Sequence, residues 1–261
     1  MSRYWKIYKT FFTTSLRREL EFRANFFAKI FQNLMWIFFF LAILWVVYSR
    51  TDSIAGWTRE EAYILAATVF LMNALMSAFF FSLMEIPSHV RMGTLDFIVT
   101  KPIDSQFWVS SRKFNFDQIG TLIAGLSMVA YGIVNGHLAP SFLQWSAYVA
   151  LVVAALVIFY SFNLALMTTG VWLVRVDNLW VLGESVMQIA RFPLDIYSAG
   201  LQRFLTFMVP LGFLATIPAK QLARAFDPAM AAYGLAWALL AFFLSRRFWQ
   251  YAMGHYTSAS S

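Results

Sequence analysis

The sequence predicts an all-α, polytopic membrane protein. Of its 261 residues, 60% are hydrophobic and 13% are charged, whereas a soluble domain carries about 25% charged residues. Apolar stretches of about 20 residues, the length of helix that crosses a bilayer, recur along the whole chain. These observations favour six transmembrane helices with no separate soluble domain.

The first 25 residues predict a cytoplasmic helix that lies in the membrane interface. On a helical wheel the apolar side chains share one side: Trp5, Tyr8, Phe12, Leu16 and Leu20. The basic side chains lie opposite: Arg3, Lys6, Arg17 and Arg18. An aromatic face against a basic face is typical of a helix on a membrane surface with anionic lipid. The alternative is a frayed cytoplasmic tail.

Residues 26–261 form the predicted transmembrane domain. Its expected spans are about 26–48, 62–84, 114–134, 143–174, 178–198 and 228–245. For the fifth crossing, 178–198 competes with 204–219, which is uncharged but contains Pro210, Gly212 and Pro218. We take 178–198 as the span and expect 201–224 to be an outer re-entrant helical hairpin, because irregular backbone at membrane depth must be covered by protein or water.

The basic residues indicate the orientation of the chain. With the N-terminus in the cytoplasm and six spans, 13 lysines and arginines fall on cytoplasmic segments and 6 on outer loops. Positive charge concentrates on the cytoplasmic side of membrane proteins. Both termini are therefore expected in the cytoplasm. The net charge of +7 indicates topology and contact with membrane lipid, and no nucleic-acid partner is expected.

The sequence contains no recognisable catalytic or metal site. It has no cysteine, and its three histidines fall in predicted loops or tails, without the i, i+3 or i+4 spacing of metal ligands. The motifs GxxxxGK[ST], GxSxG and HExxH are absent. We therefore expect no catalytic residue, no metal and no cofactor on this chain.

A few polar residues in the apolar spans are candidates for a transport path. They are Asn73, Ser77, Asn163, Thr168, Thr169 and Glu184. The uncharged ones either line the path or hydrogen bond between helices. Glu184 is the deepest charge, and it either contacts the substrate or a gate, or pairs with Arg175 or another basic residue near the headgroups.

Two long segments and the chain ending resemble a known family. The segment His89 to Asp104 reads HVRMGTLDFIVTKPID, and Phe192 to Leu222 reads FPLDIYSAGLQRFLTFMVPLGFLATIPAKQL. With the final YTSASS, these stretches resemble the permease subunit of ABC-2-type exporters, the membrane part of bacterial ABC transporters. The resemblance covers essentially the whole chain.

The resemblance implies partners and a location. Two permease subunits, identical or related, would form a dimer on two copies of a cytoplasmic ABC ATPase, which would carry ATP and Mg. The location would be the bacterial cytoplasmic (inner) membrane. The N-terminal helix would be the connecting helix of the family. The segment 85–107 would be the coupling segment that fits a groove on the ATPase.

The residues of the segment 85–107 give this role a physical basis. Gly93 and Pro102 bracket a short apolar run, Leu95, Phe97, Ile98 and Val99, for which Thr94 is the expected N-cap. The product is a rigid knob with Arg91, Asp96 and Lys101 at its rim. The alternative is an ordered cytoplasmic loop without a partner.

The predicted function is therefore that of a permease subunit of an ATP-driven exporter. Aromatic and methionine-rich spans suit an amphipathic or apolar substrate, such as a drug-like or lipid-linked compound. One alternative is an ATP-independent carrier or facilitator. The other is a membrane-embedded lipid-modifying enzyme, which the lack of clustered ionisable residues disfavours.

Overall fold

The computed structural model describes residues 2–173 and 179–256, and no strand occurs in these ranges. Five helices in them are long and apolar enough to cross a membrane. They contain α2 (Arg23–Tyr48), α3 (Arg59–Phe80), α7 (Ile119–Asn135), α8 (Phe142–Thr168) and α12 (Pro228–Gly254), and for α3, α7 and α8 also the adjoining helical turns. The chain is thus an all-helical, polytopic membrane protein, as predicted.

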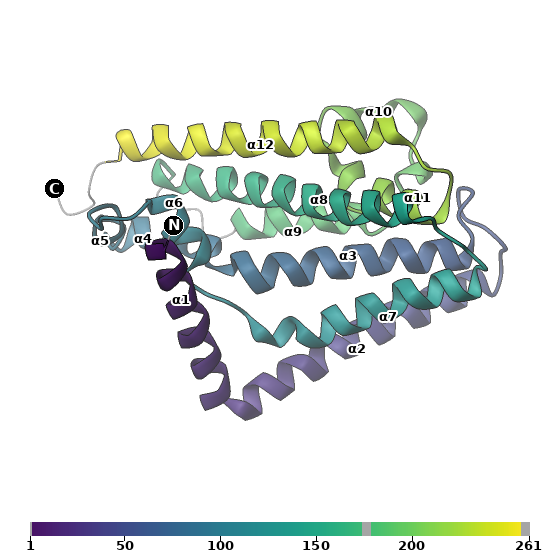
Figure 1. Cartoon of the computed structure of the whole chain (residues 1–261), viewed down its shortest axis with the longest axis horizontal. Helices are drawn as coiled ribbons and strands as arrows, with labels where there is room; N and C mark the ends of the chain where they lie inside the picture. Colours follow the sequence, from purple (N-terminus) through teal and green to yellow (C-terminus); the bar gives the residue numbers. More distant parts are fainter. Residues whose placement is uncertain (1, 174–178, 257–261) are drawn as a thin grey trace.

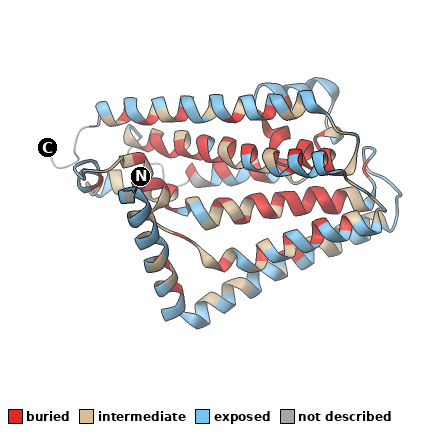
Figure 2. Cartoon of the chain, viewed as in Figure 1, coloured by how far each residue is buried: buried red, intermediate tan, exposed pale blue. Residues whose placement is uncertain are grey.

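The long helices lie side by side in the order α12, α8, α3, α7, α2 (Figure 1). The helices α3 and α8 are the long helices richest in buried residues, whereas α2 and α12 are largely exposed at the two edges (Figure 2). Both termini lie near one end of the bundle, on the left in Figure 1. We call this end the coupling end, and the opposite end, which carries the connection 49–58, the hairpin end.

Two glycines allow α7 to pack closely against α3. A Cβ at Gly132 would lie 2.6 Å from the Ile64 side chain and 2.9 Å from the Glu60 carbonyl oxygen. A Cβ at Gly125 would lie 2.9 Å from Leu71. Small residues that let helix backbones approach are a common means of association in membranes, where the hydrophobic effect between helices is weak.

The N-terminal helix α1 (Ser2–Glu21) leaves the bundle at an angle and meets α2 at the coupling end (Figure 1). Part of its predicted apolar face packs on protein: the rings of Tyr8 and Phe12 lie 5.1 and 5.4 Å from the ring of Phe114. Trp5 and Leu20, on the same predicted face, remain exposed. The face therefore both anchors α1 to the segment before α7 and leaves apolar side chains on the surface.

The segment expected as a continuous fifth span is only partly helical. Within it, α9 (Leu179–Ala190) has 12 residues, which is about 18 Å and shorter than a bilayer core. Pro193 disfavours helical backbone at the preceding residue, and a single 3-10 turn, η4 (Leu194–Ile196), follows. The junction at 174–178, where the fourth and fifth predicted spans meet, lies outside the described residues.

Two short helices form a hairpin at the hairpin end. They are α10 (Ala199–Phe207) and α11 (Thr216–Ala223), separated by the 3-10 turn η5 (Leu211–Leu214). The elements fall within the expected hairpin 201–224, apart from the first residues of α10. Glycine and proline in this region keep each helix short.

A buried tryptophan fastens this hairpin to the connection 49–58. Trp57 is fully buried, and its Nε1 donates a hydrogen bond of 2.8 Å to the Asp195 carboxylate. Lys220 Nζ is 2.7 Å from the same carboxylate. The Arg224 guanidinium lies 4.7 Å from the Trp57 ring centre and donates to Glu61 at 3.0 and 3.2 Å. The end of α11 is thereby held to α3 by an ion pair and by contacts with one buried aromatic side chain.

We predict that Trp57→Ala lowers the thermal unfolding midpoint of the purified protein by roughly 5 °C or more, because it leaves a large cavity and removes one hydrogen bond from Asp195. Intrinsic fluorescence or light scattering on heating measures this. Trp5→Ala is the matched control, since Trp5 is exposed and its loss should change the midpoint little. Equal effects of the two substitutions would contradict the fastening role of Trp57.

Candidate functional site

The segment 85–107 folds into three short helices at the coupling end. These are α4 (Ile86–Arg91), α5 (Asp96–Val99) and the first part of α6 (Ser105–Ser111). They follow the 3-10 turn η1 (Phe81–Glu85), which extends α3. Gly93 turns the chain between α4 and α5 with φ of +67°, a left-handed conformation that glycine adopts without strain. The fold of the segment is thus compact and set by the glycine.

The apolar run of this segment has a buried side and an exposed side. Leu95 and Ile98 are 0% and 2% exposed and pack into the core. Phe97 and Met92 are 71% and 62% exposed, and Val99 is exposed as well. Leu95, predicted to contact a partner, is therefore an internal anchor, and a partner can reach Phe97 and Met92 instead.

Thr94 does not cap α5 as predicted. The N-cap residue is Leu95, without a side-chain hydrogen bond to the helix. The Thr94 hydroxyl instead lies 2.8 Å from His89 Nδ1 and 3.4 Å from the His89 carbonyl oxygen. The left-handed turn at Gly93 brings Thr94 back over α4, so its hydroxyl fixes the turn and not the helix start.

The charged rim of the segment is only partly free to meet a partner. Lys101 Nζ lies 4.5 Å from the ring centre of Trp108, which the Arg112 guanidinium also approaches, at 4.7 Å. Arg91 and Pro102 are exposed, and Asp96 is half-buried. The exposed Lys101 thus lies over an aromatic ring at the rim.

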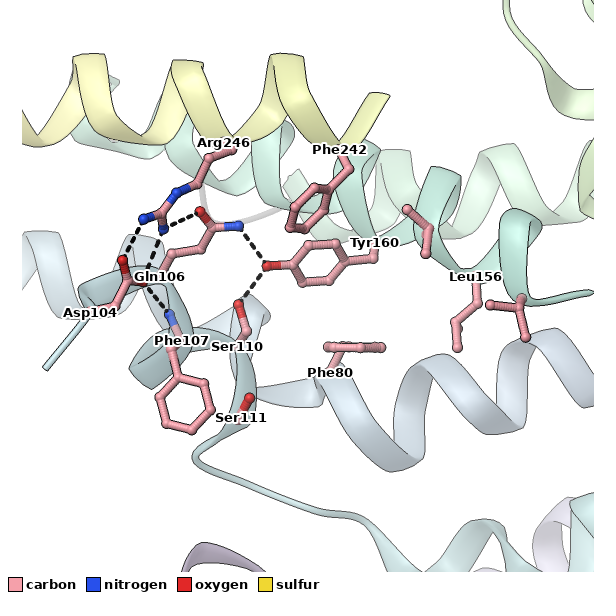
Figure 3. Close-up of a pocket in the computed structure, with 12 residues that line it drawn as sticks. Phe80, Asp104, Gln106, Phe107, Ser110, Ser111, Leu156, Tyr160, Phe242 and Arg246 are labelled. Atoms are coloured by element: carbon pink, nitrogen blue, oxygen red, sulfur yellow. Dashed lines mark hydrogen bonds and ion pairs between the residues drawn. The ribbon is translucent and has the colours of Figure 1, made fainter. Parts of the chain in front are cut away.

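A polar network connects the end of this segment to α12 and α8, as Figure 3 shows. Asp104 caps α6 by accepting from Phe107 N, and Arg246 donates to its two carboxylate oxygens at 2.9 and 2.5 Å. Arg246 also donates to Gln106 at 2.8 Å. Gln106 in turn donates to the Tyr160 hydroxyl at 3.0 Å, and Ser110 lies 2.8 Å from that hydroxyl. We call these residues, Asp104, Gln106, Ser110, Tyr160 and Arg246, the joint.

The ion pair of the joint is reflected in the pKa of Asp104. Hydrogen bonds from Arg246 hold this pKa below its ordinary value, and the Phe107 N–H acts in the same direction against the opposing effect of burial. Beside the joint lies a cavity of about 350 Å³, walled on its apolar side by Phe80, Leu156 and Phe242 (Figure 3).

Sequence reasoning missed the joint. Arg246 was expected to close the last span, but α12 continues past it to Gly254 and holds its side chain toward α6. Gln106, Ser110 and Tyr160 carry no motif. Asp104 stands two residues after Pro102 and just before a helix, where an aspartate is a typical cap, but nothing in the sequence indicates its distant partner.

Four of the six predicted path-lining residues lie around one cavity. Asn73, Ser77, Asn163 and Glu184 line a space of about 430 Å³ where α3, α8 and α9 meet. Thr168 and Thr169 are not part of it: their hydroxyls donate to the carbonyl oxygens of Leu164 and Leu166, each at 2.6 Å. Arg175, the alternative partner of Glu184, lies outside the described residues.

No group of three histidine, aspartate or glutamate side chains suited to a metal ion occurs among the residues that the structure describes.

Comparison with known protein families identifies the family of this chain. The family model described as ABC-2 family transporter protein matches residues 31–260. The chain belongs to the ABC-2 transporter family. No curated protein matches the sequence.

Membership defines the general role of the chain. An ABC-2 family protein is the membrane component, or permease, of an ABC transporter, which implies an ATPase as its partner. The long apolar helices agree with a multi-pass membrane protein. The match covers α2 from residue 31, the coupling end and the hairpin, and leaves only α1 and the start of α2 outside.

We predict that Asp104 and Arg246 of the permease are energetically coupled. Asp104→Asn and Arg246→Gln should each lower stability, and the double variant should lose less than the sum, by about 1 kcal/mol, because solvent screens partly exposed pairs. Since the pKa of Asp104 is lowered in the folded protein, this energy should be present above about pH 4 and lost as the pH falls through the folded pKa.

Thermal unfolding of the four proteins between pH 8 and pH 3 measures this coupling. Arg247→Gln is the control, because the Arg247 guanidinium lies over the ring of Phe243, 5.1 Å from its centre. Coupling of Arg247 to Asp104 as strong as that of Arg246, or no coupling at pH 7, would contradict the prediction.

Proposed function

We propose that this permease is the membrane subunit of an ATP-driven exporter of the bacterial cytoplasmic membrane, with both termini in the cytoplasm. Two copies of a separate ABC ATPase, which bind ATP and Mg, would dock on the coupling end of a permease dimer. The second permease would be identical or a related chain. The cargo would be amphipathic or apolar, drug-like or lipid-linked.

The observation that carries this proposal is the exposed apolar surface of the coupling segment. Phe97 is 71% exposed between two buried neighbours on the same run, Leu95 and Ile98. Met92 and Val99 are also exposed in this segment. Large apolar side chains gathered on a surface outside the long helices favour a protein partner, and a central aromatic anchor is typical of such contacts.

The way the segment is attached also supports transmission of force. The buried Leu95 and Ile98 fix α5 from inside, and the ion pair of Asp104 with Arg246 fixes the start of α6 to α12. A partner that pushes on Phe97 therefore acts on the long helices through packed side chains and through the bidentate ion pair of Arg246 with Asp104. A flexible loop would absorb the same movement.

The edges of the bundle fit a second permease and surrounding lipid. The helices α2 and α12 are exposed along most of their length (Figure 2). Large apolar side chains stand out from both, among them Phe31, Trp36 and Phe39 on α2 and Leu239 and Phe243 on α12. Such surfaces need an apolar environment, which the bilayer and a sister subunit would provide.

We predict that Phe97→Asp abolishes co-purification of the permease with its ATPase and reduces permease-dependent ATP turnover at least about tenfold, as expected when an interface anchor is replaced by a charge. Affinity purification of the tagged permease from membranes, followed by an ATPase assay, measures both effects.

Phe142→Asp is the matched control. Phe142 is also an exposed phenylalanine, but it begins α8 at the hairpin end. Its substitution should leave the complex intact. Two results would contradict the proposal. One is a Phe97→Asp permease that retains its ATPase with normal ATP turnover, and the other is active transport by the permease alone without ATP.

A further inference from the structure

The cavity between α3, α8 and α9 has an unusual polar lining. Its polar side chains are two asparagines, a serine and a glutamate, with no lysine, arginine or histidine. Its volume of about 430 Å³ falls in the range of small-molecule sites. The kind of ligand that this cavity can bind depends on which polar atoms of its lining have no partner within the protein.

The amide hydrogens of both asparagines are already used within their own helices. Asn73 Nδ2 donates to the Val69 carbonyl oxygen at 3.1 Å, and Asn163 Nδ2 donates to the Phe159 carbonyl oxygen at 2.9 Å. Neither side-chain oxygen has a hydrogen-bond partner in the described part of the chain. The asparagines thus offer acceptors to the cavity, and a ligand that brings donors satisfies them.

Gly183 makes room for one of these acceptors. A Cβ at this position would lie only 2.5 Å from Asn163 Oδ1. The absence of a side chain on α9 therefore lets the buried Asn163 hold its oxygen at the edge of the cavity. The neighbouring residue on α9 is Glu184, so an amide oxygen and a carboxylate meet at the same place.

Glu184 makes no ion pair or hydrogen bond with the described residues, unlike Asp104, Asp195 and Glu61, which all face lysine or arginine. Arg191 is seven residues away, on the turn that follows α9; its charge acts on Glu184 from a distance, but it does not line the cavity. Glu184 is exposed on α9, and a carboxylate beside a largely apolar cavity attracts a positively charged ligand.

The apolar part of the lining also suits a positive charge. Phe81 and Phe159 contribute aromatic rings, and Met76 and Met84 contribute thioethers. Aromatic faces attract ammonium groups, especially where water is excluded, and methionine adapts to apolar groups of varied shape. A hydrated metal ion would find only one carboxylate here, whereas a bulky organic cation finds charge, acceptors and apolar walls.

We propose that this cavity binds the cationic group of an amphipathic organic amine or other lipophilic organic cation, and that Glu184 selects it by charge. The inference rests on the proposed export function and specifies its substrate class. Asn73 and Asn163 accept hydrogen bonds where the cation carries N–H groups, and the aromatic rings contact its apolar substituents.

Binding of tetraphenylphosphonium to the full-length chain in lipid nanodiscs tests the proposal. Tetraphenylborate, of the same shape and opposite charge, is the matched ligand, and protein-free nanodiscs give the background. We expect saturable binding of the cation and none of the anion. Glu184→Gln should raise the Kd for the cation about tenfold or more, because it removes the charge and keeps the shape.

Three further variants separate the site from general effects. Glu184→Asp, which keeps the charge, should bind more tightly than Glu184→Gln. Gly183→Ala should weaken binding by displacing the Asn163 oxygen. Glu21→Gln removes an exposed carboxylate near the end of α1 and should leave the Kd unchanged.

Saturable anion binding, or an unchanged Kd in Glu184→Gln, overturns the inference. So does a Glu184→Gln protein that loses its permease partner but binds the cation normally, because Glu184 would then be a subunit contact. The outcome is independent of the coupling proposal: Phe97→Asp should lose the ATPase and still bind tetraphenylphosphonium. Failure of either result therefore identifies which of the two proposals is wrong.

Discussion

The ion pair between Asp104 and Arg246 is the contact on which the coupling end depends. It joins Asp104, the N-cap of α6, to Arg246 in the C-terminal part of α12, 142 positions away in the sequence. Through Gln106 and Tyr160 the same guanidinium is connected to α8. These side chains hydrogen bond to one another and so fix the coupling segment to two long helices, α12 and α8. The exposed residues of the segment are therefore held in a defined position.

The two ends of the bundle are closed by different chemistry. At the coupling end, the partly exposed ion pair of Asp104 with Arg246 is linked through the buried Gln106 to the Tyr160 hydroxyl. At the hairpin end, the fully buried Trp57 is enclosed by Asp195 and Arg224. A charged network can exchange partners with water at modest cost, whereas removal of a buried indole from its site exposes a large apolar surface. The coupling end is thus the better suited to rearrangement when a partner moves.

The sequence predicts the long helices well because their signal is local. Hydropathy over about 20 residues defines a span regardless of its neighbours, and Gly93 and the prolines predict the turns of the coupling segment. The choice among polar residues was less successful. Asn163 and Thr168 stand five positions apart on α8 and look alike as candidates, and both donate to the carbonyl oxygen four residues before them. Only Asn163 lines the cavity, where its side-chain oxygen is a second polar atom.

Features that depend on distant partners could not be predicted in the same way. Arg246 follows an apolar stretch, as arginines at membrane boundaries commonly do, and only the fold shows that it meets Asp104. Leu95 and Phe97 are two apolar residues of one short run, and only the packing of α5 separates the anchor from the exposed residue. Likewise, Pro193 predicts a break, but the shortness of α9 is a property of the tertiary structure around it.

The proposed cation site and the coupling segment share one short element. Phe81 and Met84, which line the cavity, belong to η1, and α4 begins at the next residue after this turn. On the other side of η1, the ring of Phe80 lies 4.7 Å from that of Tyr160 in the joint. Under the proposed coupling, a displacement of α4 by the ATPase would move Phe81 and Met84 in the cavity wall directly, without passing through a flexible loop. By the same contacts, a cation bound against Phe81 biases the position of α4, since any ligand that prefers one arrangement shifts the protein toward it.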